Sequence, residues 1–318
     1  MAQPTPSDVH VNAPLTNVSI AYMQDQTDFI ADKAFPGIPV KKQSDRYYSY
    51  DKGNWFRAKA QRRAPGAESA GSGWTVDNTP TYYCDVWALH HDVDDQVRAN
   101  ADSVLDPDIE STEFVTRDII LTKEVQWASN YFAASTWTGS STNSDITVSP
   151  KWLTAGSTPI ADMRTECRSI MKNTGFRANK AVMGEYTKDV LLDHPDLLDR
   201  IKYTETGIVS TALLAAVLGL NEILVGGAVI NTANEGATDS LDFLFGDAVL
   251  LIHSAPKPGL RTPSAGYTFH WNDLVGGFMR ILRFRMEWLK SDRVEGECAF
   301  AQKLVAAKLG AYIAAPSA

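Results

Sequence analysis

DPDIESTEFVTRDIILTKEVQWASNYFAA, residues 106–134, contains no glycine, and its only proline is the second residue. Asp106 is a suitable N-cap, and Pro107 is a suitable first helical residue because the N–H at that position needs no partner. Asp108 and Glu110 follow in the first turn, where the helix macrodipole favours negative charge. The stretch predicts one long helix of about 40 Å, at 1.5 Å per residue.

Two apolar stripes run along this predicted helix. The first contains Phe114, Leu121, Val125, Ala128 and Phe132, and the second contains Ile120, Trp127 and Tyr131. A helix that is apolar on two faces is covered on two sides, so we expect other layers to pack against both. Taken alone, the pattern indicates no more than the core helix of a globular domain.

The composition is that of a globular protein with an acidic surface. The chain has 318 residues, 44% hydrophobic and 21% charged, which allows a large core in one elaborate domain or two. Its formal charge of −8 argues against a protein whose whole surface binds nucleic acid, but leaves room for a local basic patch. Cys84, Cys167 and Cys298 fit neither a disulfide framework nor a zinc site, so we expect buried, reduced thiols.

Targeting and membrane signals are missing from the sequence. The N-terminal residues MAQPTPSDVHVNAP have neither the basic nor the apolar region of a signal peptide. The most apolar run, Thr211–Leu220, has about half the length that a membrane span requires. We therefore expect a soluble, intracellular protein.

The N-terminal quarter of the chain predicts an arm followed by an outsized hairpin. Residues 1–43 have little periodicity apart from a short helix between Ile20 and Lys33, so we expect an arm that lies on another surface. Strand patterns run from Arg46 to a turn-rich tip, RRAPGAESAGSG, and return from Trp74 to Val93. An arm of that length reaches about 60 Å when extended, and two strands alone do not bury enough surface to be stable. The hairpin therefore needs a partner surface.

Residues 157–276 predict an alternating α/β unit. Thr158 opens a helix through Lys172 with Gly175 as its stop, and Ser210 caps a second helix that ends near Gly219. KAVMG, EILVGGAVIN and LDFLFGDAVLLIHSA predict buried strands. In the tail, Leu282, Phe284, Met286 and Trp288 alternate with charged residues, which predicts an antiparallel pair that turns at SDR (291–293) and runs on to the end.

A metal site is the best enzyme hypothesis. His90, Asp92 and Asp94 in HHDVDDQ would share one face of a strand, where such a trio could bind a divalent metal in a hydrolase. Metal ligands usually come from separate elements held by further hydrogen bonds, so we favour a solvated strand end. We find no catalytic constellation and predict no cofactor and no metal.

Arg57, Lys59, Arg62 and Arg63 form the one dense basic run. Phosphate contacts need only clustered charge, so nucleic acid is one possible partner. The other is an acidic neighbouring protein, which we favour because sister subunits of this chain are themselves acidic. We therefore predict these four residues to be an inter-subunit contact at the hairpin tip.

Taken together, the arm, the hairpin, the long helix and the α/β unit resemble the major capsid proteins of tailed bacteriophages. Seven stretches carry this likeness: YDKGNWFR (50–57), RAPGAESAG (63–71), HHDVDDQVRANAD (90–102), HPDLLDRIKYT (194–204), NTANEGATDSLDF (231–243), APKPGLRTPSAGYTFHW (255–271) and RFRMEWLKSDRVEGECAF (283–300). The likeness spans nearly the whole chain and includes no catalytic signature.

The resemblance implies an α+β fold of the Hong Kong phage type. Its parts would be an N-arm (1–43), an extended E-loop β-hairpin (44–96), a peripheral domain with a long spine helix (97–150), an α/β axial domain (151–276), and return strands of the peripheral domain (277–318). It also implies a structural, non-enzymatic subunit of an icosahedral virion, self-assembling into hexamers and pentamers that enclose double-stranded DNA.

The partners implied are other copies of the chain, a portal, decoration proteins and non-specifically held DNA, with no membrane, and assembly in the bacterial host cytoplasm. Because only the short arm precedes the hairpin, we expect a separate scaffolding protein. An encapsulin-like nanocompartment, which has the same fold but packages an enzyme, is the alternative, and the hydrolase is a remote one.

Overall fold

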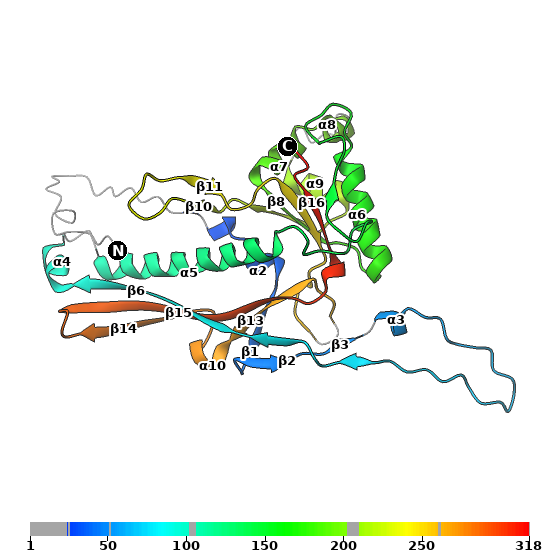
Figure 1. Cartoon of the computed structure of the whole chain (residues 1–318), viewed down its shortest axis with the longest axis horizontal. Coiled ribbons are helices and arrows are strands. Elements are labelled where there is room, and N and C mark those ends of the chain that lie inside the picture. Colours follow the sequence, from blue (N-terminus) through cyan, green and yellow to red (C-terminus); the bar gives the residue numbers. More distant parts are fainter. Residues whose placement is uncertain are drawn as a thin grey trace.

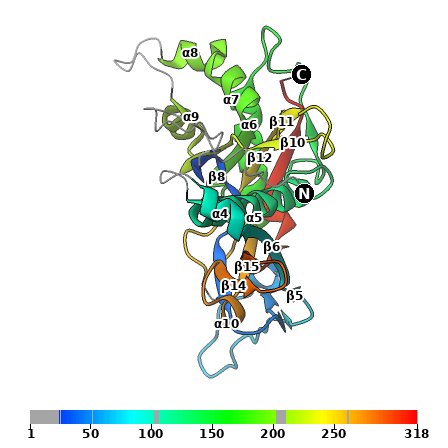
Figure 2. The same cartoon turned by 90° about the vertical axis from the view of Figure 1, so that its left-hand side faces the viewer.

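One long helix, α5 (Pro107–Tyr131), spans the body of the molecule and packs on two different sheets. The computed structural model describes residues 24, 26–50, 52–101, 106–201, 210–259 and 262–317. In Figure 1 the first sheet lies below α5, and the second sheet, with its helices, stands above the right-hand end of α5. Figure 2, seen from the left, shows the same layers stacked from top to bottom.

The predicted start of α5 is confirmed. The Asp106 side chain accepts hydrogen bonds from the backbone N–H groups of Asp108 and Ile109, and Pro107 is the first helical residue. The helix ends at Tyr131, three residues before the predicted end at Ala134.

The predicted first stripe of α5 is wrong in part. Phe114 is 58% exposed and Leu121 is only half-buried, although Ala128 and Phe132 are buried as expected. The face that packs on the first sheet contains Val115 and Ile119 instead. Two charged residues of this helix, Lys123 and Glu124, are also buried. A pattern of apolar residues cannot predict their burial, because it does not include charged residues.

The first sheet contains five strands. They are β1 (Gly37–Val40), β13 (Gly266–Trp271), β15 (Ser291–Leu304), β14 (Arg280–Met286) and β6 (Asp85–Asp94), with the long β15 bonded to β13, β14 and β6. Val115 and Ile119 of α5 pack over Gly296 of β15, where a Cβ atom would lie 2.5 Å from the Val115 side chain. Gly296 thus allows the helix and the sheet to approach closely.

The second sheet is covered on both faces. Its order is β7 (Ile146–Thr147), β16 (Gly310–Ala314), β12 (Ala248–Ile252), β8 (Lys180–Gly184) and β9 (Glu222–Gly226). One face carries a helical layer of α6 (Pro159–Thr174), α7 (Glu185–Leu192), α8 (Pro195–Ile201) and α9 (Thr211–Leu218). The other face packs on Trp127 and Phe132 near the end of α5. The predicted α/β character of this region is confirmed, as are the Gly175 and Gly219 helix stops.

Several strand assignments from the sequence are corrected by the pairing. β13 belongs to the first sheet although it lies within the predicted α/β unit, and the last strand, β16, belongs to the second sheet. The turn between β14 and β15 lies at residues 287–290, ahead of the predicted SDR turn. β10 (Val229–Asn231) and β11 (Leu241–Phe243) form a separate exposed hairpin, not buried strands. Local periodicity predicts strands but cannot say which partner each will find.

The short elements complete the described chain. They are η1 (Gln26–Asp28), α2 (Ala31–Ala34), β2 (Ser44–Arg46), β3 (Ser49–Tyr50), α3 (Lys52–Trp55), β4 (Val76–Asp77), β5 (Thr81–Tyr83), α4 (Asp95–Asn100), α10 (Asn272–Val275) and η2 (Ala307–Leu309). Most of the predicted arm, residues 1–23 and 25, lies outside the described residues. Ile30, Ala34 and Phe35, by contrast, are at most 1% exposed, so this part of the arm belongs to the core.

The three cysteines are buried and unbonded, as expected. Burial raises the pKa of the thiols of Cys84, Cys167 and Cys298 to about 11. Within the described residues, no helix has both the length and the apolar character to cross a bilayer.

Candidate assembly surfaces

The segment from Ser44 to Tyr83 leaves the first sheet and extends beyond the body (Figure 1). Its two arms are joined by short antiparallel pairings, β2 with β5 and β3 with β4. Residues 57–75 then have neither helix nor strand, so the strands are much shorter than predicted. We call residues 44–83 the long hairpin.

Aromatic stacking anchors the base of the long hairpin. The Tyr82 ring stacks on Phe269 of β13 with 4.5 Å between ring centroids, and Tyr47 stacks on the same ring at 5.9 Å. Next to them Cys84 is fully buried and its backbone N–H donates to the Gln43 carbonyl. The base is therefore part of the folded body, which fixes the direction in which the hairpin leaves.

Farther out, large apolar side chains face solvent. Trp55, Phe56 and Trp74 are 56%, 63% and 59% exposed, and the two indole rings lie 5.8 Å apart. Burial of these three aromatic rings would be favourable, and most of that free energy is not gained while they are exposed. Contiguous exposed apolar groups of this kind mark interaction surfaces.

The four predicted contact residues lie along the same segment. Arg57, Arg62 and Arg63 are exposed and Lys59 is half-buried. Within the described part of the chain, none of the four forms an ion pair; Arg63 and Lys59 donate only to the carbonyls of Ala67 and Gly73 in the hairpin itself. Their charge is therefore available to an acidic partner.

The long hairpin also contacts the helical layer. The Lys52 ammonium donates to the Asn173 carbonyl at 2.7 Å, near the end of α6. The Phe56 ring lies over Gly175, where a Cβ atom would come within 2.7 Å of it. Gly175 has a φ of +80°, so glycine suits this position both for backbone conformation and for space.

The acidic residues of the HHDVDDQ segment stabilise the fold at the far end of the first sheet. Both Asp92 oxygens accept hydrogen bonds from Arg293 on β15, at 2.7 and 2.8 Å, and this contact holds the pKa of Asp92 below its ordinary value. Asp94 caps α4 by accepting from the Gln96 N–H. Among the residues that the structure describes, no cluster of three potential metal ligands is found.

A network of ion pairs, which we did not predict, lies at this end of the sheet. It joins Arg98, Arg283 and Arg285 to Asp95, Asp108 and Asp292, with nitrogen–oxygen distances of 2.5–3.5 Å. Hydrogen bonding, above all from Arg283, lowers the pKa of Asp292. The alternation of Arg283 and Arg285 in the sequence is the signal that could have indicated paired strands carrying opposite charges.

No family model matches the chain. Among curated proteins it is similar to the major capsid protein of Pseudomonas phage JBD67, with 25% identity over 274 residues, which covers 84% of this chain and 85% of that protein. The major capsid protein of Burkholderia phage BcepMu is also 25% identical, over 273 residues, covering 81% of this chain and 82% of that protein.

Solved structures show the same fold. A phage-related protein from Bordetella bronchiseptica RB50 matches with a TM-score of 0.70 and 22% identity, covering 92% of this chain and 94% of that one. A subunit of the mature capsid of bacteriophage PhiM1 matches with a TM-score of 0.62 and 13% identity, covering 96% and 92%. The chain is thus similar to phage major capsid proteins in both sequence and fold.

The predicted Hong Kong phage-type α+β fold is confirmed. The sequence relatives are capsid proteins, in agreement with the predicted structural, non-enzymatic role. The same fold occurs in the SrpI encapsulin from Synechococcus elongatus, with a TM-score of 0.55 and 8% identity, covering 95% of this chain and 91% of that one. Both sequence relatives, however, are phage proteins.

A buried charged cluster attaches the described part of the arm to α5. The Glu124 carboxylate accepts the backbone N–H groups of Ile30 and Ala31 at 2.8 and 3.0 Å, at the start of α2. Lys123 pairs with Asp32 at 2.5 Å and lies 4.3 Å from the Phe278 ring centroid. The described arm residues are thus held by both hydrogen bonds and charge.

Burial perturbs the titration of this cluster. It raises the pKa of Glu124 to about 7 and lowers the pKa of Lys123. His270, on β13, has its pKa lowered to about 4 by burial and by the nearby Lys123. The burial of Lys123 and Glu124 could not be predicted from the sequence, because charged residues are normally solvated.

Proposed function

We propose that this chain is a capsid protein, the repeating subunit of an icosahedral tailed-phage head, forming hexamers and pentamers around packaged double-stranded DNA. The long hairpin is the observation that carries the proposal. It projects from a well-packed body, and its outer part exposes Trp55, Phe56 and Trp74. Such a segment is stable in that position only if another surface covers it, and the surface present in every capsid is a neighbouring copy.

In this arrangement each part of the fold has a place. The long hairpin acts as the E-loop, α5 as the spine helix, the first sheet as the peripheral domain, and the second sheet with its helical layer as the axial domain. The base of the hairpin is anchored by Tyr82 and Cys84, so it can transmit load from a neighbour into the first sheet.

The charge of the hairpin suits an acidic neighbour. Arg57, Lys59, Arg62 and Arg63 add four positive charges to one projecting segment of a chain whose formal charge is −8. Copies of an acidic protein repel one another unless a basic segment meets an acidic one. We therefore assign these four residues to the contact with the next subunit, supported by the exposed aromatic rings beside them.

Further partners follow from the same proposal. A scaffolding protein would direct assembly in the bacterial host cytoplasm, and a portal and decoration proteins would join the virion. Packaged DNA would meet the inside of the shell without sequence preference. The encapsulin alternative rests on fold alone, whereas the phage function is supported by relatives with 25% identity over most of their length.

The test is electron microscopy of particles formed by the full chain and by a variant in which Arg57–Gly73 is replaced by a short Gly-Ser link. We expect closed shells from the full chain, and from the variant a folded subunit that forms none, because large assembly interfaces depend on such overlapping segments. Circular dichroism and thermal unfolding check the fold of the variant. Closed shells from the variant would remove the assembly role of the hairpin.

A further inference from the structure

Two exposed faces of the helical layer carry opposite charges. The basic face consists of Arg164, Arg168, Met171 and Lys172 on α6, with Phe176 beyond its end. The acidic face consists of Tyr186, Asp189 and Asp193 on or next to α7, with Leu198 and Asp199 on α8. Every one of these residues is exposed in the subunit.

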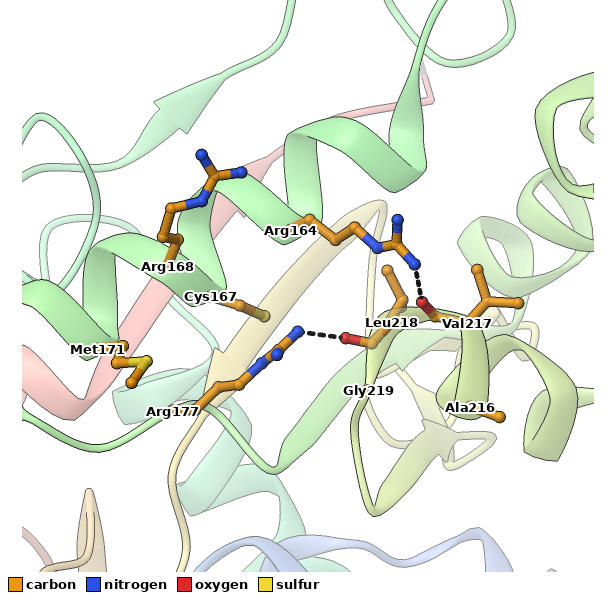
Figure 3. Close-up of a pocket in the computed structure, with 9 residues that line it drawn as sticks. All are labelled: Arg164, Cys167, Arg168, Met171, Arg177, Ala216, Val217, Leu218 and Gly219. Carbon is orange, nitrogen blue, oxygen red and sulfur yellow. Dashed lines mark hydrogen bonds between the residues drawn. The ribbon is translucent and has the colours of Figure 1, made fainter.

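The residues of the basic face follow the helical repeat. Arg164, Arg168 and Lys172 are four residues apart, so their charges line one side of α6 at intervals of about 6 Å along the axis. Arg164 and Arg168 border a hollow of about 450 Å³ between α6 and α9 (Figure 3). This charged row faces away from the core residues Met163, Cys167 and Ile170.

Some of the cations at this hollow have a partner within the subunit. Arg164 and Arg177 donate to the carbonyls of Val217 and Leu218, which neutralises the end of α9. Arg168 points away from both carbonyls in Figure 3. Within the described residues, neither Arg168 nor Lys172 has an ion-pair partner, so their charge is not explained by the fold of the subunit.

The acidic face lies elsewhere on the same layer. Tyr186, Asp189 and Asp193 fall within a 60° arc of α7, by about 100° per residue. Lys188, 3.4 Å from Asp189, offsets only part of the negative charge. α7 packs on β8 and β9, whereas α6 packs on β12 and β16, so the two helices that carry these faces lie over different parts of the second sheet (Figure 1).

We propose that the basic face of one subunit docks on the acidic face of the next subunit around a ring. The occupant of each face is thus a second copy of this chain. Two complementary surfaces at different places on one chain make a head-to-tail contact, and such contacts close into rings when the rotation allows. The inference rests on the proposed shell function and adds the surfaces that join axial domains within a capsomer.

Exposed apolar side chains favour a protein over nucleic acid as the partner. Met171 and Phe176 are 53% and 41% exposed on the basic face, and Tyr186 and Leu198 are 51% and 44% exposed on the acidic face. Aromatic residues, Met and Arg are enriched at protein interfaces, where apolar anchors and complementary charge occur together. Contacts to phosphates need the charge but not the apolar groups.

Charge reversal tests the contact with four variants of the full chain. The basic-face variant is Arg168→Glu/Lys172→Glu, the acidic-face variant is Asp189→Lys/Asp193→Lys, and the combined variant carries all four changes. The control variant, Lys257→Glu/Lys308→Glu, changes the net charge as much as the basic-face variant but at exposed positions outside both faces. Sedimentation velocity measures the concentration at which oligomers form, and circular dichroism checks the fold.

Each single-face variant should need at least about tenfold more protein to form oligomers, because like charges then meet across the interface. The combined variant should recover most of this loss, and the control should behave as the wild type. An equal mixture of the two single-face variants should form even-numbered rings only, because a reversed basic face must alternate with a reversed acidic face.

Two results would overturn the contact while leaving the shell function intact. One is a basic-face variant that assembles at the same concentration as the wild type. If its particles have also lost DNA, α6 is a DNA-facing surface. The other is a combined variant that assembles no better than either single-face variant. A wild-type chain that stays monomeric would instead contradict the shell function itself, and this contact with it.

Discussion

Four tryptophans show how the body of the molecule differs from the long hairpin. Trp127 and Trp137 are 0% and 1% exposed between α5 and the second sheet, whereas Trp55 and Trp74 are 56% and 59% exposed on the long hairpin. The first pair stabilises the subunit by its own burial, and the second pair has its apolar surface still in water. The difference indicates that the body of one subunit buries its own apolar surface, whereas the outer part of the hairpin needs the surface of a second subunit.

The strongest test of the buried region is Trp127→Ala. Trp127 packs against Phe35, Tyr131 and Phe245, so its removal leaves a large cavity among aromatic rings. We expect the free energy of unfolding to fall by about 3–5 kcal/mol, as for other buried aromatic truncations. Chemical denaturation of the free subunit measures it, and a loss below about 1 kcal/mol would mean that this end of α5 is not tightly packed.

Ile119→Ala sharpens the assignment of the buried face of α5. Ile119 is 3% exposed against β15, so we expect a loss of about 2–5 kcal/mol. Leu121→Ala, a matched change on the half-buried face, should cost clearly less. Equal losses in the two variants would contradict the face that we assign to the first sheet.

Glu124 predicts a pH dependence of the attachment of the arm. Its pKa is about 7 in the folded subunit and near 4.5 when unfolded, so the folded state binds more protons between these values. The free energy of unfolding therefore falls as pH rises through this window, by at most about 1.4 kcal/mol per pH unit, because Glu124 becomes ionised while buried.

Glu124→Gln removes this titration. The free energy of unfolding of the wild type, relative to that of the variant, should decline between about pH 5 and pH 7. His270 titrates in the opposite direction but is present in both proteins, so comparing the two largely removes its contribution. A difference that is constant across this range would show that Glu124 is not buried as described.

The smallest effect on folding is expected for Trp55→Ala with Trp74→Ala. Both side chains are exposed, so the free energy of unfolding of the free subunit should change by no more than about 0.5 kcal/mol. Assembly should nevertheless weaken, because aromatic residues of this kind contribute much of the binding energy at interfaces. A large loss of subunit stability would show that the hairpin tip belongs to the core.

The sequence predicts well what depends on local chemistry. The Asp106 cap, Pro107, and the glycine stops at Gly175 and Gly219 each follow from the backbone groups of a helix end, and all are found as expected. The position of the hairpin also follows from local signals, because its strand patterns flank a segment rich in glycine and proline.

The sequence does not predict what depends on distant partners. β13 and β16 have strand patterns, but nothing local shows that they join different sheets from their chain neighbours. Phe114 lies exposed although it fits an apolar stripe, whereas Lys123 and Glu124 are buried because residues 30–32 supply their partners. The charges of Asp92 and Asp94 are used by Arg293 and the start of α4, which the HHDVDDQ motif alone could not show.

Hydrogen–deuterium exchange of the hairpin tip, compared between free subunits and assembled particles, tests the central claim most directly. Residues 57–73 have no strand ladder within the subunit, so their amides should exchange quickly in the free protein and become protected on assembly. The amides in the middle of α5 should be equally protected in both states. Fast exchange at residues 57–73 in intact particles would contradict the account, because the hairpin would then lack a partner even in the shell.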